Sequence, residues 1–191
     1  VDPYKKRKVR ILNGAHTSMV LAARMYGLET VGECMEDEKV VSILRKSVFE
    51  EIIPAIGDTE DNRNFGNAVF ERFANPFIRH QLLSIALNSV SKFRARVLPT
   101  ILEFKEQRGR YPQILSFSLA ALIAFYKTDE ANDSEEIIGF MKEASVADIL
   151  NREDYWGEDI SSLYDIVNTW FEKIEKDGVA ACYDELLKWK A

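Results

Sequence analysis

The stretch from Gln113 to Tyr126 constrains the fold more than any other segment. From Ile114 to Phe125 every residue is apolar except two serines. A helix that is apolar on all sides is normally buried among other helices. Leucine and alanine outnumber β-branched residues and no turn signal divides the stretch, which argues against a buried pair of strands. The stretch is also too short to cross a bilayer. We therefore expect a helix over residues 113–126 at the centre of the core, and no membrane insertion.

The rest of the chain shows apolar residues at helical spacing of three to four, and no alternating strand pattern. Asn75-Pro76 has the residue types of a helix start, and Pro54 those of a helix stop. Residues 1–7 are interpreted as a linker and the serine-rich, basic residues 89–96 as a break. The prediction is an all-α fold, one domain over 1–191, with further helices at 15–26, 40–53, 65–73, 76–87, 97–108, 137–144, 146–152, 160–177 and 179–189.

The charge and cysteine content exclude several functional classes. The 191 residues include 31 acidic and 25 basic side chains, a net charge of -6, and the basic residues are scattered rather than clustered. This balance argues against nucleic-acid binding. The two cysteines cannot form a disulfide framework, so a cytoplasmic location is expected. Because the chain begins with Val and shows no leader, we expect it to be a fragment of a longer protein.

Two common kinds of site have no sign in the sequence. The nine glycines never approach the G-x-G-x-x-G pattern of a dinucleotide-binding loop. The only two histidines, His16 and His80, lie far apart in the sequence, and no cysteine cluster accompanies them. A zinc site is therefore not expected.

Lys8, Asn13 and His16 form the one group of polar residues with complementary chemistry. A lysine can act as a general base when its pKa is lowered, while asparagine and neutral histidine can donate to a substrate oxygen. On a regular helix with roughly 100° per residue, Asn13 and His16 share a face, but Lys8 lies about 140° from Asn13. Convergence would need a large substrate or a change in backbone direction near Asn13-Gly14. The alternative is a solvated basic face with a helix cap and a surface histidine.

Several segments resemble one enzyme family. The string KVRILNGAHT, residues 8–17, resembles the catalytic segment of the polyol-type long-chain dehydrogenases, the mannitol dehydrogenase family. ERFANP at residues 71–76, the Leu98-Pro99 pair and SFSLAALIAFYK at residues 116–127 are similar to the C-terminal domain of that family. The similarity covers the whole chain. The N-terminal Rossmann domain of the family has no counterpart here.

The resemblance implies an NAD-dependent oxidoreductase that interconverts tagaturonate and altronate. Lys8 would be the general acid/base, and Asn13 and His16 would bind and polarise the reacting oxygen. NAD would be bound mainly by the absent domain, no metal would be needed, and this chain alone would be inactive. Fructuronate or mannitol is the alternative substrate within the family. An alternative of another class is a non-catalytic helical interaction module.

A hexuronate also carries a carboxylate, which calls for an ammonium or guanidinium partner. Lys92 and Arg96 are the selected candidates, and the alternative is that both are simply exposed charges. His80 could also contribute to binding the carboxylate, but a partly buried structural histidine is the preferred interpretation. The large aromatic residues are expected in the core, namely Phe117, Trp156, Trp170 and Trp189.

Overall fold

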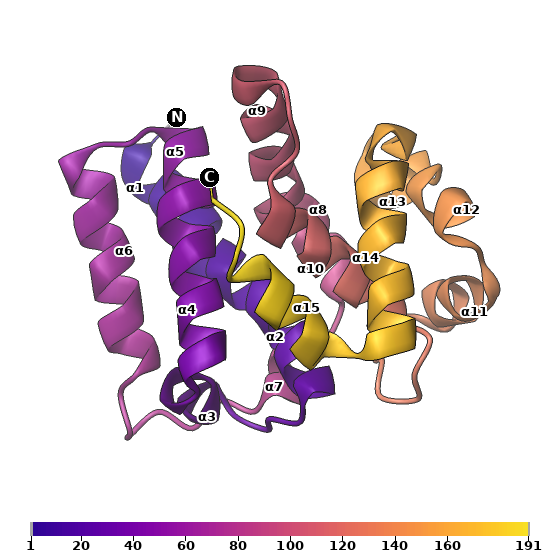
Figure 1. Cartoon of the computed structure of the whole chain (residues 1–191), viewed down its shortest axis with the longest axis horizontal. Helices are drawn as coiled ribbons and strands as arrows, with labels where there is room; N and C mark the ends of the chain where they lie inside the picture. Colours follow the sequence, from indigo (N-terminus) through magenta and orange to yellow (C-terminus); the bar gives the residue numbers. More distant parts are fainter. Residues whose placement is uncertain (1, 191) are drawn as a thin grey trace.

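The computed structural model describes residues 2–190, and the predicted all-α fold is confirmed (Figure 1). Within these residues the only β-type pairing is one isolated antiparallel bridge between Thr30 and Gln81. No helix among them is both long enough and apolar enough to cross a membrane. The elements in chain order are α1 (Pro3–Arg7), η1 (Lys8–Asn13), α2 (Gly14–Tyr26), α3 (Val31–Glu36), α4 (Glu38–Lys46), η2 (Ser47–Ile52), α5 (Ile53–Ile56), α6 (Glu60–Phe73), α7 (Leu82–Ile85), α8 (Ser89–Arg96), α9 (Leu98–Arg108), α10 (Gln113–Phe125), α11 (Glu135–Glu143), α12 (Val146–Leu150), α13 (Glu153–Trp156), η3 (Ser161–Leu163), α14 (Tyr164–Asp177) and α15 (Val179–Leu186).

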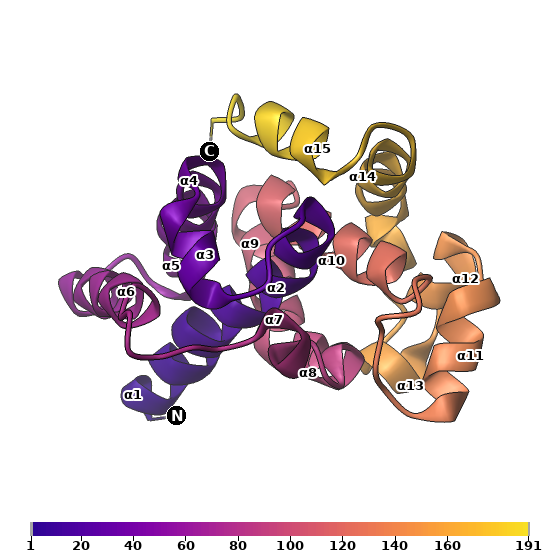
Figure 2. The same ribbon diagram turned by 90° about the horizontal axis from the view of Figure 1, so that it is seen from below.

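Helix α10 is the centre of the core, as its composition predicts. Every residue from Ile114 to Phe125 is buried. The helix packs against α14 on one side and α2 on the other. Figure 2 shows α10 between the group formed by α1–α6 and the group formed by α11–α14. Because α2 packs directly on α10, the segment that carries Asn13 and His16 is attached to the most deeply buried element of the protein.

The first helix is longer than the sequence pattern indicates. The elements α1, η1 and α2 follow one another without a break from Pro3 to Tyr26. The Asp2 carboxylate accepts the Tyr4 N–H at 3.0 Å, and Pro3 occupies the first helical position, where its missing N–H costs nothing. The predicted linker or broken element over residues 1–7 is therefore wrong for Pro3–Arg7, Asp2 caps the helix, and Val1 lies outside the described residues. Gly27 ends the helix with φ 117°, as predicted.

Pro54 does not stop the second helix. Elements α4, η2 and α5 continue from Glu38 to Ile56, and the chain leaves the helix at Gly57 with φ 130°. The turn before the proline is π-helical, and the Ile53 N–H donates to the Val48 carbonyl, five residues back. A proline removes one hydrogen bond of an α-helix and crowds the preceding turn. The wider π turn just before Pro54 gives a physical reason why the helix survives there.

The structure contradicts two further predictions. No helix begins at Asn75-Pro76, because the Asn75 side chain accepts the Phe77 N–H at 2.9 Å and forms a turn. Only α7 is helical within the predicted helix 76–87. Conversely, the predicted break at residues 89–96 is helix α8, whose Val90 and Phe93 are buried. Here the apolar spacing outweighs the polar composition.

The remaining predicted helices are present with small shifts at their ends. The predicted helix 65–73 is the C-terminal part of α6, which begins at Glu60, and the other predicted helices correspond to α9, α11, α12, α14 and α15. Phe117, Trp156 and Trp170 are buried as predicted. Trp189 is 45% exposed, so its placement in the core was wrong. It lies beyond the end of α15, where the chain leaves the packed face.

Candidate functional site

The turn that carries Lys8 and Asn13 is π-helical rather than α-helical. In η1 the hydrogen bonds join residues five apart, and the Gly14 N–H donates to the Val9 carbonyl. Lys8 and Asn13 are also five residues apart, so one π turn brings them to the same side of the helix. The separation of about 140° expected for a regular helix does not apply. No change of backbone direction is needed, because the register changes within a straight run of helix.

Gly14 allows a second element to approach this turn. A Cβ atom added at Gly14 would lie 3.0 Å from the carbonyl oxygen of Arg96, the last residue of α8. That distance is tighter than an ordinary van der Waals contact. The absence of a side chain at Gly14 therefore brings the C-terminal end of α8, with Lys92 and Arg96, close to the first helix.

A cavity of about 190 Å³ opens beside the first helix. Asn13 and His16 both contribute to its wall, so the structure brings these two predicted residues together. Lys8 is exposed and lies one turn before them, outside the lining. The cavity is lined by Leu12, Asn13, His16, Val31, Arg72, Phe73, Ile78 and His80.

His16 is the most distinctive group in this cavity. Its ring stacks on Phe73 with centroids 4.3 Å apart and an interplanar angle of 10°. Its Nε2 atom is buried and has no hydrogen-bond partner among residues 2–190. Burial, reinforced by the charges of His80 and Arg72, lowers the pKa of His16 to about 4. The imidazole is therefore neutral near pH 7 and can donate to, or accept from, a ligand oxygen.

Lys92 and Arg96 lie near this site but do not line the cavity. Their positive charges are among the causes that lower the pKa of His16. The Lys92 ammonium donates to the Ile85 carbonyl at 2.9 Å, and the Arg96 guanidinium to the Thr17 hydroxyl at 3.4 Å. Burial lowers the pKa of Lys92, with a smaller contribution from Arg96. Both cations thus contribute to the local potential, and each donates one hydrogen bond to a protein oxygen.

Arg72 and His80 line the cavity and were not selected from the sequence. His80 is exposed, so the expectation of a partly buried structural histidine was wrong. Its carbonyl accepts the Val31 N–H at 3.0 Å, which holds the backbone of an otherwise irregular segment next to α3. Arg72 lies inside the ERFANP motif, which was the available signal for it. His80 offered no such signal, because nothing in the local sequence shows which elements its side chain faces.

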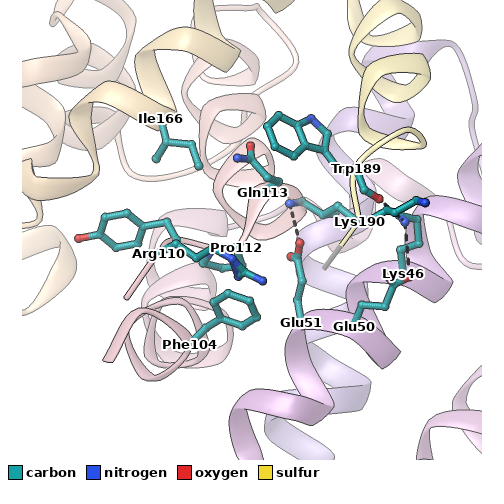
Figure 3. A pocket seen from close by; sticks show the side chains of 12 residues that line it. Lys46, Glu50, Glu51, Phe104, Arg110, Pro112, Gln113, Ile166, Trp189 and Lys190 are labelled. Carbon is teal, nitrogen blue, oxygen red and sulfur yellow. Dashed lines mark hydrogen bonds and ion pairs between the residues drawn. The ribbon is translucent and has the colours of Figure 1, made fainter. Parts of the chain in front are cut away.

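A second cavity, of about 210 Å³, lies between η2, the start of α10 and the C-terminal residues (Figure 3). Glu51 points toward α10 and accepts the N–H groups of Ile114 and Leu115, both at 2.9 Å. Lys46 donates to the Trp189 carbonyl at 2.7 Å. Burial raises the pKa of Glu51 to about 7. We interpret Glu51 as the structural cap of α10, because its two oxygens satisfy helix N–H groups that otherwise have no partner.

Within the described residues, no group of three or more histidine, cysteine or acidic side chains lies close enough together to hold a metal ion. The chemistry that this chain can offer at the first cavity is hydrogen bonding by Asn13 and His16 in a positively charged environment. Lys8 adds an ionisable amine one turn away.

Residues 1–176 match the family described as the mannitol dehydrogenase C-terminal domain. The chain belongs to this family. Altronate oxidoreductase of Yersinia pestis bv. Antiqua (strain Nepal516) is 40% identical over 195 residues, which cover 92% of this chain and 40% of the relative. Altronate oxidoreductase of Pectobacterium carotovorum subsp. carotovorum (strain PC1) is 43% identical over 165 residues, or 86% of this chain and 32% of the relative. This mannitol dehydrogenase C-terminal domain therefore spans at most about two fifths of those relatives.

Solved structures show the same fold. The chain superposes on Pseudomonas fluorescens mannitol 2-dehydrogenase, determined as a ternary complex with NAD and D-mannitol, with a TM-score of 0.88 and 23% identity. The match covers 98% of this mannitol dehydrogenase C-terminal domain and 41% of that chain. A substrate-free D-sorbitol dehydrogenase gives a TM-score of 0.80 at 20% identity, covering 94% of this chain and 40% of the other. At sequence identities of 23% and 20%, these superpositions show a shared fold and nothing more.

Proposed function

We propose that this domain is the substrate-binding part, carrying the general base, of an NAD-dependent oxidoreductase that interconverts tagaturonate and altronate. The observation that carries the proposal is the unpartnered, neutral imidazole of His16 beside Asn13 in a cavity edged by cations. The 40% identity to altronate oxidoreductase favours a hexuronate over mannitol. The two free, buried cysteines agree with a cytoplasmic location.

The residues of this chain do not fit NAD by themselves. The described cavities are not bordered by a glycine-rich phosphate loop, and no such loop occurs in the sequence. We therefore assign the NAD-binding residues to a domain outside this chain. When bound, NAD supplies the hydride acceptor for oxidation of the substrate alcohol.

The proton chemistry can be assigned to side chains of this domain. Asn13 would donate to the reacting oxygen, and Nε2 of His16 would gain the partner that it lacks. Lys8 would remove the hydroxyl proton in oxidation and return it in reduction. Lys8 is exposed in this chain, and a second domain packed over it would desolvate the ammonium. The π turn supports this assignment because it places Lys8 and Asn13 on one side.

The test is an assay of NADH oxidation by the full-length protein with tagaturonate, fructuronate and fructose. Tagaturonate is the expected substrate. Replacement of Lys8 by alanine should lower kcat by about a hundredfold or more, the usual contribution of a positioned acid/base group. Lys5→Ala is the matched control, because Lys5 is an exposed lysine one turn earlier on the same helix. Turnover that Lys8→Ala leaves unchanged would refute the assignment of Lys8. Absence of turnover with all three substrates would favour the non-catalytic helical interaction module.

Lys92 and Arg96 keep a supporting role in this proposal. They would raise the affinity for a negatively charged substrate through the local potential rather than through a direct contact, because neither side chain lines the cavity.

A further inference from the structure

We infer that Arg72 and His80 form the subsite for the substrate carboxylate, next to Asn13 and His16, which hold the reacting oxygen. The inference rests on the proposed function, because it presumes a hexuronate substrate. It replaces Lys92 and Arg96 as the direct carboxylate ligands. It also predicts that these two side chains make the site select hexuronates over neutral ketohexoses.

The side chains of Arg72 and His80 have hydrogen-bond donors available for a ligand. Arg72 and His80 both line the cavity, and neither side chain has a hydrogen bond or an ion pair within residues 2–190. Arginine offers a planar fork of donors that matches a carboxylate, and an imidazole N–H can donate one further hydrogen bond. Lys92 and Arg96, in contrast, are outside the lining and already donate to protein oxygens.

The charged groups around His16 are basic. The leading charged groups that lower the pKa of His16 are His80, Arg72, Arg96 and Lys92, and all four are basic side chains. The whole chain nevertheless carries a net charge of -6. A local cluster of positive groups in an acidic protein attracts an anionic ligand to this cavity. A neutral sugar alcohol carries no net charge and would gain no such attraction from the cluster.

The two histidines lie within reach of one ligand. The ring centroids of His16 and His80 are 5.9 Å apart. In an open-chain ketohexuronate, up to four carbon–carbon bonds separate the carbonyl carbon from the carboxylate carbon. At about 1.5 Å per bond and bond angles of about 111°, the extended span is about 5 Å. One molecule can therefore reach both histidines. The volume of about 190 Å³ exceeds the roughly 150 Å³ of a cavity that holds benzene.

Both proposed ligands are held by ordered structure. Arg72 lies in the last turn of α6, directly before Phe73, whose ring supports His16. The backbone at His80 is fixed by two hydrogen bonds, from the Val31 N–H to the His80 carbonyl at 3.0 Å and from the Leu82 N–H to the Glu29 carbonyl at 2.9 Å. The backbone that carries both proposed ligands is therefore held in place before a ligand binds, which lowers the entropic cost of recognition.

The experiment compares two substrates in the full-length protein. The first is tagaturonate, and the second is the ketohexose that carries a hydroxymethyl group in place of the carboxylate. Arg72→Gln should raise the KM for tagaturonate at least tenfold and leave kcat/KM for the neutral ketohexose within about twofold, because only the charged substrate loses a charge-assisted contact. His80→Gln should have the same selectivity with a smaller effect. Arg79→Gln is the matched control, because Arg79 is exposed, close in sequence and not part of the lining.

Equal losses for both substrates in Arg72→Gln, or an effect no larger than that of Arg79→Gln, would overturn the inference. ADP-ribose, which carries phosphates but no carboxylate, tests whether the cations face the cofactor. Weaker inhibition by ADP-ribose in Arg72→Gln, with tagaturonate unaffected, would also overturn it. If the unsubstituted protein turns over neither sugar, the proposed function itself fails, and that outcome is visible before any variant is made.

Discussion

The rings of His16 and Phe73 lie face to face, with centroids 4.3 Å apart and planes 10° from parallel. His16 belongs to α2, which packs on the central helix α10, and Phe73 to the end of α6, so this contact joins α2 to a helix at the edge of the molecule (Figure 1). It covers one face of the imidazole and leaves the cavity open beside it. The stack explains why a histidine in a ligand-accessible place is nevertheless strongly desolvated.

The first prediction concerns His16 and pH. Burial lowers its pKa to about 4, compared with 6.5 for an ordinary histidine. The unfolded chain therefore binds the proton first as the pH falls from 6.5 to 4, and the free energy of unfolding should decrease by up to about 3 kcal/mol from this group. NMR titration of the two histidine rings measures the pKa directly. His16→Gln should remove this contribution and His80→Gln should retain it. A normal pKa for His16 would contradict the prediction.

Glu51 should have the opposite dependence on pH. Burial raises the pKa of its carboxyl to about 7 from 4.5, so the native state holds a proton that the unfolded state releases. The free energy of unfolding should therefore decrease as the pH rises from 4.5 to 7, by up to about 3 kcal/mol from this group. Urea unfolding across this range measures the effect. Glu51→Gln should abolish it, whereas Glu50→Gln, on the half-exposed neighbour, should not. The contributions of His16 and Glu51 have opposite signs and partly cancel in the unsubstituted protein. The change of the free energy of unfolding with pH should therefore be larger in each single variant than in the unsubstituted protein.

Gly14→Ala should destabilise the protein. The new Cβ would lie 3.0 Å from the Arg96 carbonyl oxygen, a backbone atom that cannot move without shifting α8. Overpacking of this kind costs about 1–3 kcal/mol. Gly139→Ala is the control, because Gly139 is an exposed position within α11 with nothing near the added atom. That variant should gain about 0.5–1 kcal/mol from helix propensity. Denaturant unfolding of both variants is the measurement, and equal effects would exclude a steric role for Gly14.

Tyr126 should be required to hold α8 in place. Its buried hydroxyl accepts the Val90 N–H at 3.2 Å and donates to Asp133 at 2.7 Å. Tyr126→Phe leaves the buried Val90 N–H without a partner, which costs about 1–3 kcal/mol. Tyr111→Phe removes an exposed hydrogen bond to Ser162 and should change the free energy of unfolding by less than about 0.5 kcal/mol. Hydrogen exchange at the Val90 amide provides a local readout. Unchanged protection in Tyr126→Phe would refute the role.

Two segments, residues 75–76 and 89–96, differ from their predicted structure for distinct physical reasons. Asn75-Pro76 has the residue types of a helix start, but the Asn75 side chain bonds to the Phe77 N–H and makes a turn instead. In residues 89–96 the polar composition indicated a break, whereas Ser89 is buried and its hydroxyl donates to the Ala86 carbonyl at 2.7 Å. Side chains that can bond to nearby backbone are compatible with either a turn or a helix. Only their neighbours in the fold decide between the two.

The candidate site was also predicted in part. Asn13 and His16 were expected on one helical face, and both line the cavity. The relation of Lys8 to Asn13 could not be read from a regular helical period, because the π turn of η1 changes the register. Lys92 and Arg96 lie outside the cavity wall, whereas Arg72 and His80 line it and come from segments more than fifty residues further along the chain than Asn13 and His16.

The sequence by itself determined the all-α class, the buried central helix and the family. These properties depend on local spacing and on motifs, and apolar periodicity specifies which faces are buried without reference to distant residues. Only the tertiary structure decided which polar groups meet. The π turn beside α8, the stacking of Phe73 on His16 and the position of His80 all depend on contacts between elements remote in sequence. Local sequence does not encode such contacts, because the free energy that stabilises them comes from packing in the assembled core.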